Sequence, residues 1–219
     1  MKVYKFRSTS NLSYCLDILV KNRLFCANIT THSDLGSGSF DIEASLNTLP
    51  DDAAAFMQEV QAELKRIRVC SLAGSFNNST LWERYAGGYD GVVFELDISC
   101  ENLWQVEYVD NLIVQKESMN GLSPQEFTRI ALSKKMDIWS SEGEYLIICP
   151  FEFYRLSNLV ARVIVGSNVA DSVVGAFYLI GKQLGVPVEK LEHAVDGRLS
   201  TRPVKSYVQL GYHGISTDA

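Results

Sequence analysis

The segment Gly91-Val92-Val93-Phe94-Glu95-Leu96-Asp97-Ile98 decides the fold class, because it is a β-rich run with two more expected strands directly after it. These strands are residues 103–108 and 111–115, joined by a turn at Asp110-Asn111. Strands that come in clusters, without strict alternation with helices, indicate an α+β fold with a mainly antiparallel sheet.

The rest of the chain extends this pattern in both directions. Further strands are expected at residues 3–7, 24–27, 69–72, 144–149, 159–165 and 205–210. Helices are expected at residues 10–22, 50–68, 79–86, 123–136 and 171–184, and a loop at residues 30–40. Two helices have clear boundary signals: Ser123 and Glu126 form a capping box around Pro124, and Gly185 stands just after the last helix.

Length, composition and charge are typical of a soluble globular protein. The chain has 219 residues, 47% of them hydrophobic, and a formal net charge of −6. These values fit a single domain over 1–219, with 168–219 as a helix-plus-strand extension packed on it. No apolar run approaches the ~18 residues of a membrane span, and the N-terminus lacks the apolar core of a signal peptide. We therefore expect a cytoplasmic protein with no membrane partner.

Cysteines, histidines and basic residues give weaker indications. The acidic charge disfavours a general nucleic-acid coat, although a basic group near the C-terminus keeps nucleic-acid binding as a less favoured option: Lys182, Lys190, Arg198, Arg202 and Lys205. No metal spacing is found among the histidines His32, His193 and His213, so no metal site is expected. The odd number and wide spacing of the cysteines predict buried free thiols: Cys15, Cys26, Cys70, Cys100 and Cys149.

A carboxylate pair stands at the start of the apolar strand 144–149, where one residue separates Glu142 from Glu144. If the strand extends back to Glu142, both side chains point to the same face, because side chains alternate with a period of two. Like charges on one face repel each other. The pair is either two surface acids at a solvated strand end or a functional site. In a functional site, one acid would stabilise positive charge at a sugar carbon and the other would activate an acceptor.

Two further groups are candidates for ligand binding, each with a structural alternative. Trp82 and Tyr85 share one face of the expected helix 79–86, beside a glycine-rich turn, and would either stack on a planar ring or belong to the core. Lys5 and Arg7 share one face of strand 3–7, where they would form an anion site or only extend along a strand edge into solvent.

Taken in order, several segments resemble a large bacterial family of domains of unknown function. The segments are Tyr4-Lys5-Phe6-Arg7-Ser8, Asn22-Arg23-Leu24-Phe25, Ser39-Phe40-Asp41, Cys70-Ser71, Leu81-Trp82-x-x-Tyr85-Ala86, 91–97, Val106-x-Tyr108, Trp139-x-x-Glu142-x-Glu144 and 161–166. The resemblance covers residues 2–167. That family is in turn remotely similar to the ADP-ribosyltransferase superfamily, in the order of its elements and in the late Glu-x-Glu motif.

The resemblance implies an ADP-ribosyltransferase-like fold, with a mainly antiparallel sheet split around a cleft and helices on the flanks. It also implies NAD as the substrate and Glu144 and Glu142 as the catalytic acids. The contacts with NAD would come from Lys5, Arg7, Ser71, Trp82 and Tyr85. Such proteins act as toxins or in defence against phage, by transferring ADP-ribose to a protein or a nucleic acid. The alternative is a non-catalytic module of the same fold that binds a nucleotide or a protein.

Overall fold

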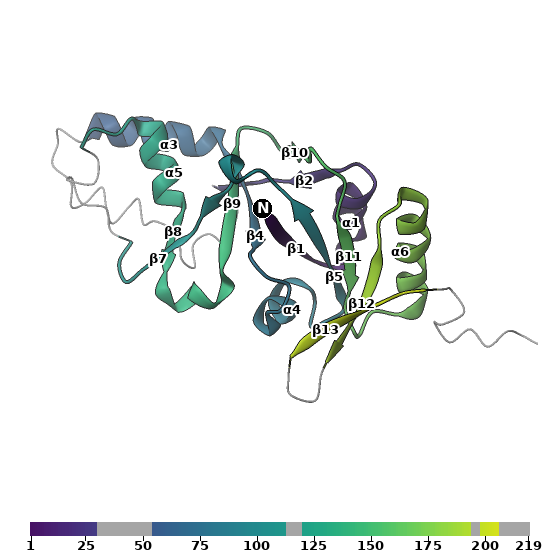
Figure 1. Ribbon diagram of the computed structural model, residues 1–219. Coiled ribbons are helices and arrows are strands. Elements are labelled where there is room, and N and C mark those ends of the chain that lie inside the picture. Colours follow the sequence, from purple (N-terminus) through teal and green to yellow (C-terminus); the bar gives the residue numbers. More distant parts are fainter. Residues whose placement is uncertain (30–53, 113–119, 194–197, 206–219) are drawn as a thin grey trace, which may run out of the picture. The chain divides into compact units, whose positions relative to one another are not determined.

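The computed structural model describes residues 1–29, 54–112, 120–193 and 198–205 (Figure 1). The chain forms two compact units, each assembled from separate stretches of sequence. The first unit contains residues Met1–Leu24, Ala73–Ile98 and Arg155–Ala219, and the second contains Phe25–Leu72 and Ser99–Tyr154. The two units are defined by their compactness, and the expected single domain over 1–219 stays a prediction.

Five paired strands belong to the first unit, in the order β13-β12-β11-β5-β1. The strands are β1 (Lys2–Ser8), β5 (Gly91–Asp97), β11 (Arg162–Val165), β12 (Val188–His193) and β13 (Leu199–Pro203). The pairs β1–β5, β5–β11 and β12–β13 are antiparallel, and β11–β12 is parallel. Strand β5, which lies between β11 and β1, is buried from Gly91 to Leu96, as its apolar sequence predicts.

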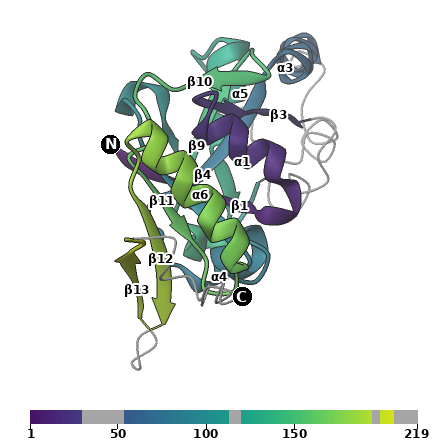
Figure 2. The ribbon, with the colours of Figure 1, turned by 90° about the vertical axis from the view of Figure 1, so that its right-hand side faces the viewer.

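Helices cover both faces of this sheet. They are α1 (Leu12–Leu19), which follows the 3-10 turn η1 (Thr9–Asn11), α4 (Ser79–Tyr85) and α6 (Asp171–Leu184). Trp82 of α4 packs on one face, in the cluster that contains Val93 of β5. Phe94, the next residue of β5, points to the opposite face and contacts Phe177 of α6, with ring centroids 6.5 Å apart. Figures 1 and 2 show α4 and α6 on opposite sides of these strands.

The second unit contains β3 (Ala27–Asn28), α3 (Ala54–Arg66), β4 (Arg68–Ala73), η5 (Cys100–Asn102), β6 (Trp104–Gln105), β7 (Glu107–Val109), α5 (Pro124–Leu132), β8 (Lys134–Met136), η7 (Asp137–Glu142) and β9 (Glu144–Cys149). Three of its strands lie in the order β4-β9-β6, and β3 pairs with β4. A separate parallel pair joins β7 to β8. The chain passes between the units in β4 and in β2 (Arg23–Phe25) and β10 (Phe153–Arg155).

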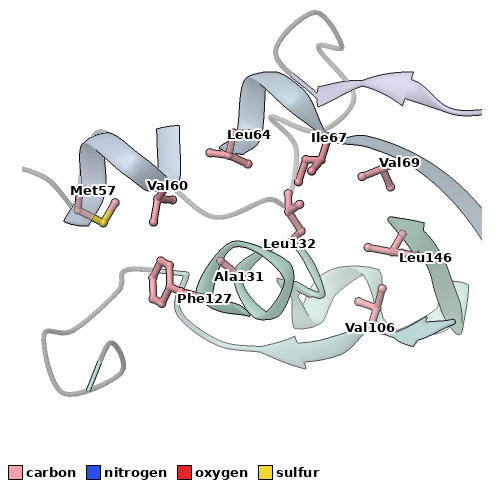
Figure 3. Close-up of a cluster of buried hydrophobic side chains, with 10 residues drawn as sticks. All are labelled: Met57, Val60, Leu64, Ile67, Val69, Val106, Phe127, Ala131, Leu132 and Leu146. Atoms are coloured by element: carbon pink, nitrogen blue, oxygen red, sulfur yellow. The ribbon is translucent and has the colours of Figure 1, made fainter. Parts of the chain in front are cut away.

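A hydrophobic core holds α3 and α5 against the strands of the second unit (Figure 3). Met57 and Val60 of α3 lie close to Phe127 of α5, and Val69 and Leu146 belong to β4 and β9. The helical residues among these recur every three to four positions, which is the apolar period of a helix with one buried face. The core therefore follows directly from the periodicity of α3 and α5.

The structure confirms a mixed α+β fold with a mostly antiparallel sheet, and it corrects several boundaries. The expected helix 123–136 ends at Leu132, and β8 follows it. The polar stretch after Gly185 forms β12 and β13, which add to the sheet of the first unit. The expected helix 10–22 is shorter, with Asn11 at the N-cap position of α1 and Leu19 as its last residue. The loop 30–40, the start of helix 50–68, residues 113–115 and the strand 206–210 lie outside the described residues.

Candidate functional site

Glu142 and Glu144 are brought together by a turn. Glu142 is the last residue of η7, Gly143 adopts a left-handed conformation with φ 54°, and Glu144 opens β9. The expectation that the strand extends back to Glu142 is therefore wrong. Both side chains are buried, with 5% of each residue exposed. The interpretation of two surface acids at a solvated strand end is also wrong.

Lys135 of β8 binds both carboxylates. Its Nζ lies 3.5 Å from Oε2 of Glu142 and forms an ion pair with Oε2 of Glu144. The lysine side chain is itself largely buried, with 16% exposed. Burial alone would lower the pKa of the Lys135 ammonium, but the carboxylates of Glu144 and Glu142 outweigh it and raise the pKa. Lys135 is therefore protonated at neutral pH, and the three charged side chains sum to one net negative charge.

Tyr108 completes the group. The backbone N–H of Glu144 donates a hydrogen bond of 2.9 Å to the Tyr108 hydroxyl. Tyr108 is paired with Lys135 in the parallel ladder of β7 and β8. Burial raises the pKa of the Tyr108 phenol, and the nearby Glu144 carboxylate acts in the same direction. We call these four residues, Lys135, Tyr108, Glu142 and Glu144, the Glu–Lys–Glu cluster.

Sequence reasoning found both carboxylates of this cluster but missed the lysine. Lys135 falls in a segment that the sequence assigned to the end of a helix, because the strong capping box at Ser123 has no matching stop signal before Met136. The segment 134–136 becomes a strand through pairing with β7, from Glu107↔Lys134 to Val109↔Met136. Such pairing is non-local, and local sequence patterns do not contain it.

The predicted cationic residues of β1 lie in the first unit. Arg7 points toward α1, where its guanidinium lies 5.3 Å from the centroid of the Tyr14 ring, a cation–π distance. Its Nε is buried and accounts for one of the polar side-chain atoms without a hydrogen bond in the described part of the chain. Lys5, on the same face of β1, is half-buried. Whether these residues bind the NAD phosphates stays a prediction.

The predicted aromatic residues differ in burial. Trp82 is fully buried, its indole N–H donates a 2.8 Å hydrogen bond to the carbonyl of Phe76, and its ring packs edge-on against Phe6. This is the core position that the sequence left open as the alternative to ligand stacking. Tyr85 is 45% exposed, so it does not belong to the core, which was the structural alternative for this residue. Ser71, in the second unit, is exposed.

The structure thus brings together Glu142 and Glu144 in the second unit and leaves Lys5, Arg7, Trp82 and Tyr85 in the first. Within the described ranges, no group of three histidine, cysteine or acidic side chains is placed to hold a metal ion. No helix of the described part is long and apolar enough to span a membrane. Comparison with protein families, curated proteins and solved structures found no match for the chain.

Proposed function

We propose that the chain is an ADP-ribosyltransferase-like enzyme that binds NAD and breaks its N-glycosidic bond, with Glu144 and Glu142 as its acids. The observation that carries the proposal is the burial of both carboxylates around one lysine at the start of β9. Burying two carboxylates side by side opposes folding, so their retention in such a position favours a chemical role.

The chemistry suits this charge arrangement. When the bond between the nicotinamide nitrogen and the ribose carbon breaks, the electron pair goes to nitrogen and positive charge develops on the ribose ring. A carboxylate held in a site of low polarity stabilises such charge more strongly than it would in water. The negative charge of Glu144 would stabilise the ribosyl cation, and Glu142 would accept the proton of the attacking acceptor.

Lys135 and Tyr108 would act as positioning residues. Lys135 neutralises part of the charge of the pair, which reduces the repulsion between the two carboxylates. Tyr108 accepts the backbone N–H of Glu144 and so fixes the turn that aims this side chain. The acceptor would be water, a protein or a nucleic acid, and the last two would suit a toxin or a phage-defence effector.

A second candidate is a non-catalytic module that binds a nucleotide or a protein. The ion pair from Lys135 to Glu144 favours it, because a carboxylate bound to a lysine already has a structural partner. In that case the Glu–Lys–Glu cluster would only fasten β8 and η7 to β9.

Nicotinamide release from NAD by the purified chain, with and without bacterial lysate as a source of acceptors, tests the proposal. Glu144→Gln should lower turnover by ~10²–10³, the loss typical of removing one electrostatic stabiliser. Glu142→Gln should impair transfer to an acceptor and spare slow hydrolysis. Glu107→Gln is the matched control, because Glu107 pairs with Lys134 at an exposed position of the neighbouring strands.

Absence of nicotinamide release by the wild-type chain, or equal small effects of both substitutions, would contradict the enzyme. Calorimetric titration with NAD then separates the two candidates. Binding without turnover supports the non-catalytic module, and the absence of both removes NAD from the function.

A further inference from the structure

Three cysteines of the second unit gather where β3, β4 and β9 meet. Cys26 directly precedes β3, and the antiparallel register Ala27↔Val69 places it opposite Cys70 of β4. Cys149 ends β9, which is the neighbour of β4 in the sheet. The backbone N–H of Cys26 donates a 2.8 Å hydrogen bond to the carbonyl of Glu152, three residues after Cys149, so Cys26 also lies beside the end of β9.

Accessibility differs among these thiols. Cys26 and Cys70 are buried, as the sequence predicts, whereas Cys149 is half-buried and therefore open to a small solute. Outside this cluster, Cys15 is buried and Cys100 is exposed, so the expectation of buried thiols is wrong for Cys100. None of the five cysteines, all of which lie in the described ranges, forms a disulfide. A reagent that enters from solvent thus meets the cluster at Cys149.

The contacts of Cys149 favour its thiolate. Its pKa is lowered to about 7, first because the Cys26 thiol hydrogen-bonds to it, while burial opposes this shift. The positive charge of Arg68 acts in the same direction as Cys26. The pKa of Cys26 is raised, first by the same hydrogen bond to Cys149 and then by Cys70. The negative charge therefore resides on Cys149 and the proton on Cys26.

We propose that Cys149 and Cys26 form a peroxide-reactive pair, in which Cys149 reduces a hydroperoxide and Cys26 then closes a disulfide. The Cys149 sulfur attacks one peroxide oxygen, the O–O bond breaks, and the other oxygen leaves as an alcohol or as water after taking up a proton. Cys149 is oxidised by two electrons to a sulfenic acid. The Cys26 sulfur then attacks the Cys149 sulfur, the S–S bond forms, and the hydroxyl group leaves as water with the Cys26 proton.

Cys26 is the resolving residue because it hydrogen-bonds to Cys149 and holds a proton that the leaving hydroxyl needs. Cys70 stays reduced, because its buried thiol takes no part in either step. The exposed Cys100 offers a direct contrast, because reactivity set by exposure alone would oxidise it first.

The experiment treats the reduced full-length chain with stoichiometric hydrogen peroxide, blocks the remaining thiols, and maps the peptides by mass spectrometry without reduction. We expect a Cys26–Cys149 disulfide in the wild type and in Cys100→Ser. Cys149→Ser should lose the disulfide entirely. Cys26→Ser should stop at a sulfenic acid on Cys149, which dimedone traps.

Iodoacetamide alkylation of the wild-type chain over a pH series gives a test that needs no variant. The rate at Cys149 should rise with a midpoint near pH 7, following the lowered pKa. Three results would overturn the proposal: oxidation of Cys100 before Cys149, a disulfide between Cys26 and Cys70 in place of the expected one, or an unchanged disulfide pattern in Cys149→Ser. NAD is absent from these assays, so their outcome is independent of the enzyme proposal.

Discussion

Each unit buries an ion cluster, and the two clusters divide their charges differently. In the first unit, Arg162 lies between Glu95 and Glu189, at 2.7 and 2.5 Å, and Lys2 binds the second oxygen of Glu95 at 2.8 Å. The four charged side chains sum to zero. In the second unit, Lys135 contacts both Glu142 and Glu144, and the formal charges of these three side chains sum to −1.

The difference separates a scaffold from a candidate site. The cations of the first cluster outweigh the burial that would raise the pKa of Glu95, and they lower it. Thr201 also donates a 2.6 Å hydrogen bond to Glu189, so these carboxylates have matched partners. The Glu–Lys–Glu cluster carries one formal negative charge in excess, and both of its carboxylates are buried. Such an arrangement would stabilise a cation that develops in a substrate.

The largest effect is expected for Lys135→Met, which removes the shared cation of two buried carboxylates. The free energy of unfolding should fall by about 4 kcal/mol at neutral pH, as is typical when one partner of a buried pair is lost. Urea unfolding followed by tryptophan fluorescence measures this loss.

Lys134→Met is the matched control, because Lys134 is the preceding residue of β8 and its ion pair with Glu107 is exposed. Its effect should stay below about 1 kcal/mol. If both lysine variants lost the same stability, the Glu–Lys–Glu cluster would not be an energetically coupled group, and the comparison between the units would collapse.

A smaller loss, of about 2 kcal/mol, is expected for Arg162→Ala, because a second cation remains beside Glu95. Arg202→Ala removes an exposed ion pair with Glu192 in the same unit and should cost less than about 1 kcal/mol. A loss for Arg162→Ala as large as that for Lys135→Met would mean that Lys2 does not compensate for the missing guanidinium.

How much of this could be predicted from sequence depended on whether the signal was local. The helix 171–184 matches α6 residue for residue, and the start of α5 follows its capping box, because both boundaries are set by neighbouring residues. β12 and β13 were missed because their stretch is polar and forms strands by pairing with each other and with β11. The alternation rule places Glu142 and Glu144 on one face of a strand, whereas in the structure Gly143 turns the chain between them.

The smallest effect concerns acid, and it distinguishes the two clusters by pH. The pKa of Glu95 is lowered in the folded state from its ordinary value of 4.5, because hydrogen bonds from Lys2 and Arg162 outweigh burial. Between the lowered pKa and pH 4.5, Glu95 is protonated in the unfolded chain and still ionised in the folded chain. The stability that Glu95 contributes is therefore present above pH 4.5 and is lost as the pH falls toward the lowered pKa.

A chain with Trp82 as its one tryptophan reports on the first unit, because this residue is buried in that unit's core. Trp104→Phe and Trp139→Phe remove the other two. In this background, urea midpoints should decline in acid more steeply with Glu95 present than in Glu95→Gln, since the glutamine has no proton to take up. The free energy of unfolding that the chain loses in acid through Glu95 should be smaller than the loss for Arg162→Ala. Parallel slopes would mean that Glu95 gains nothing from its two cations, and the first cluster would then be no better compensated than the second.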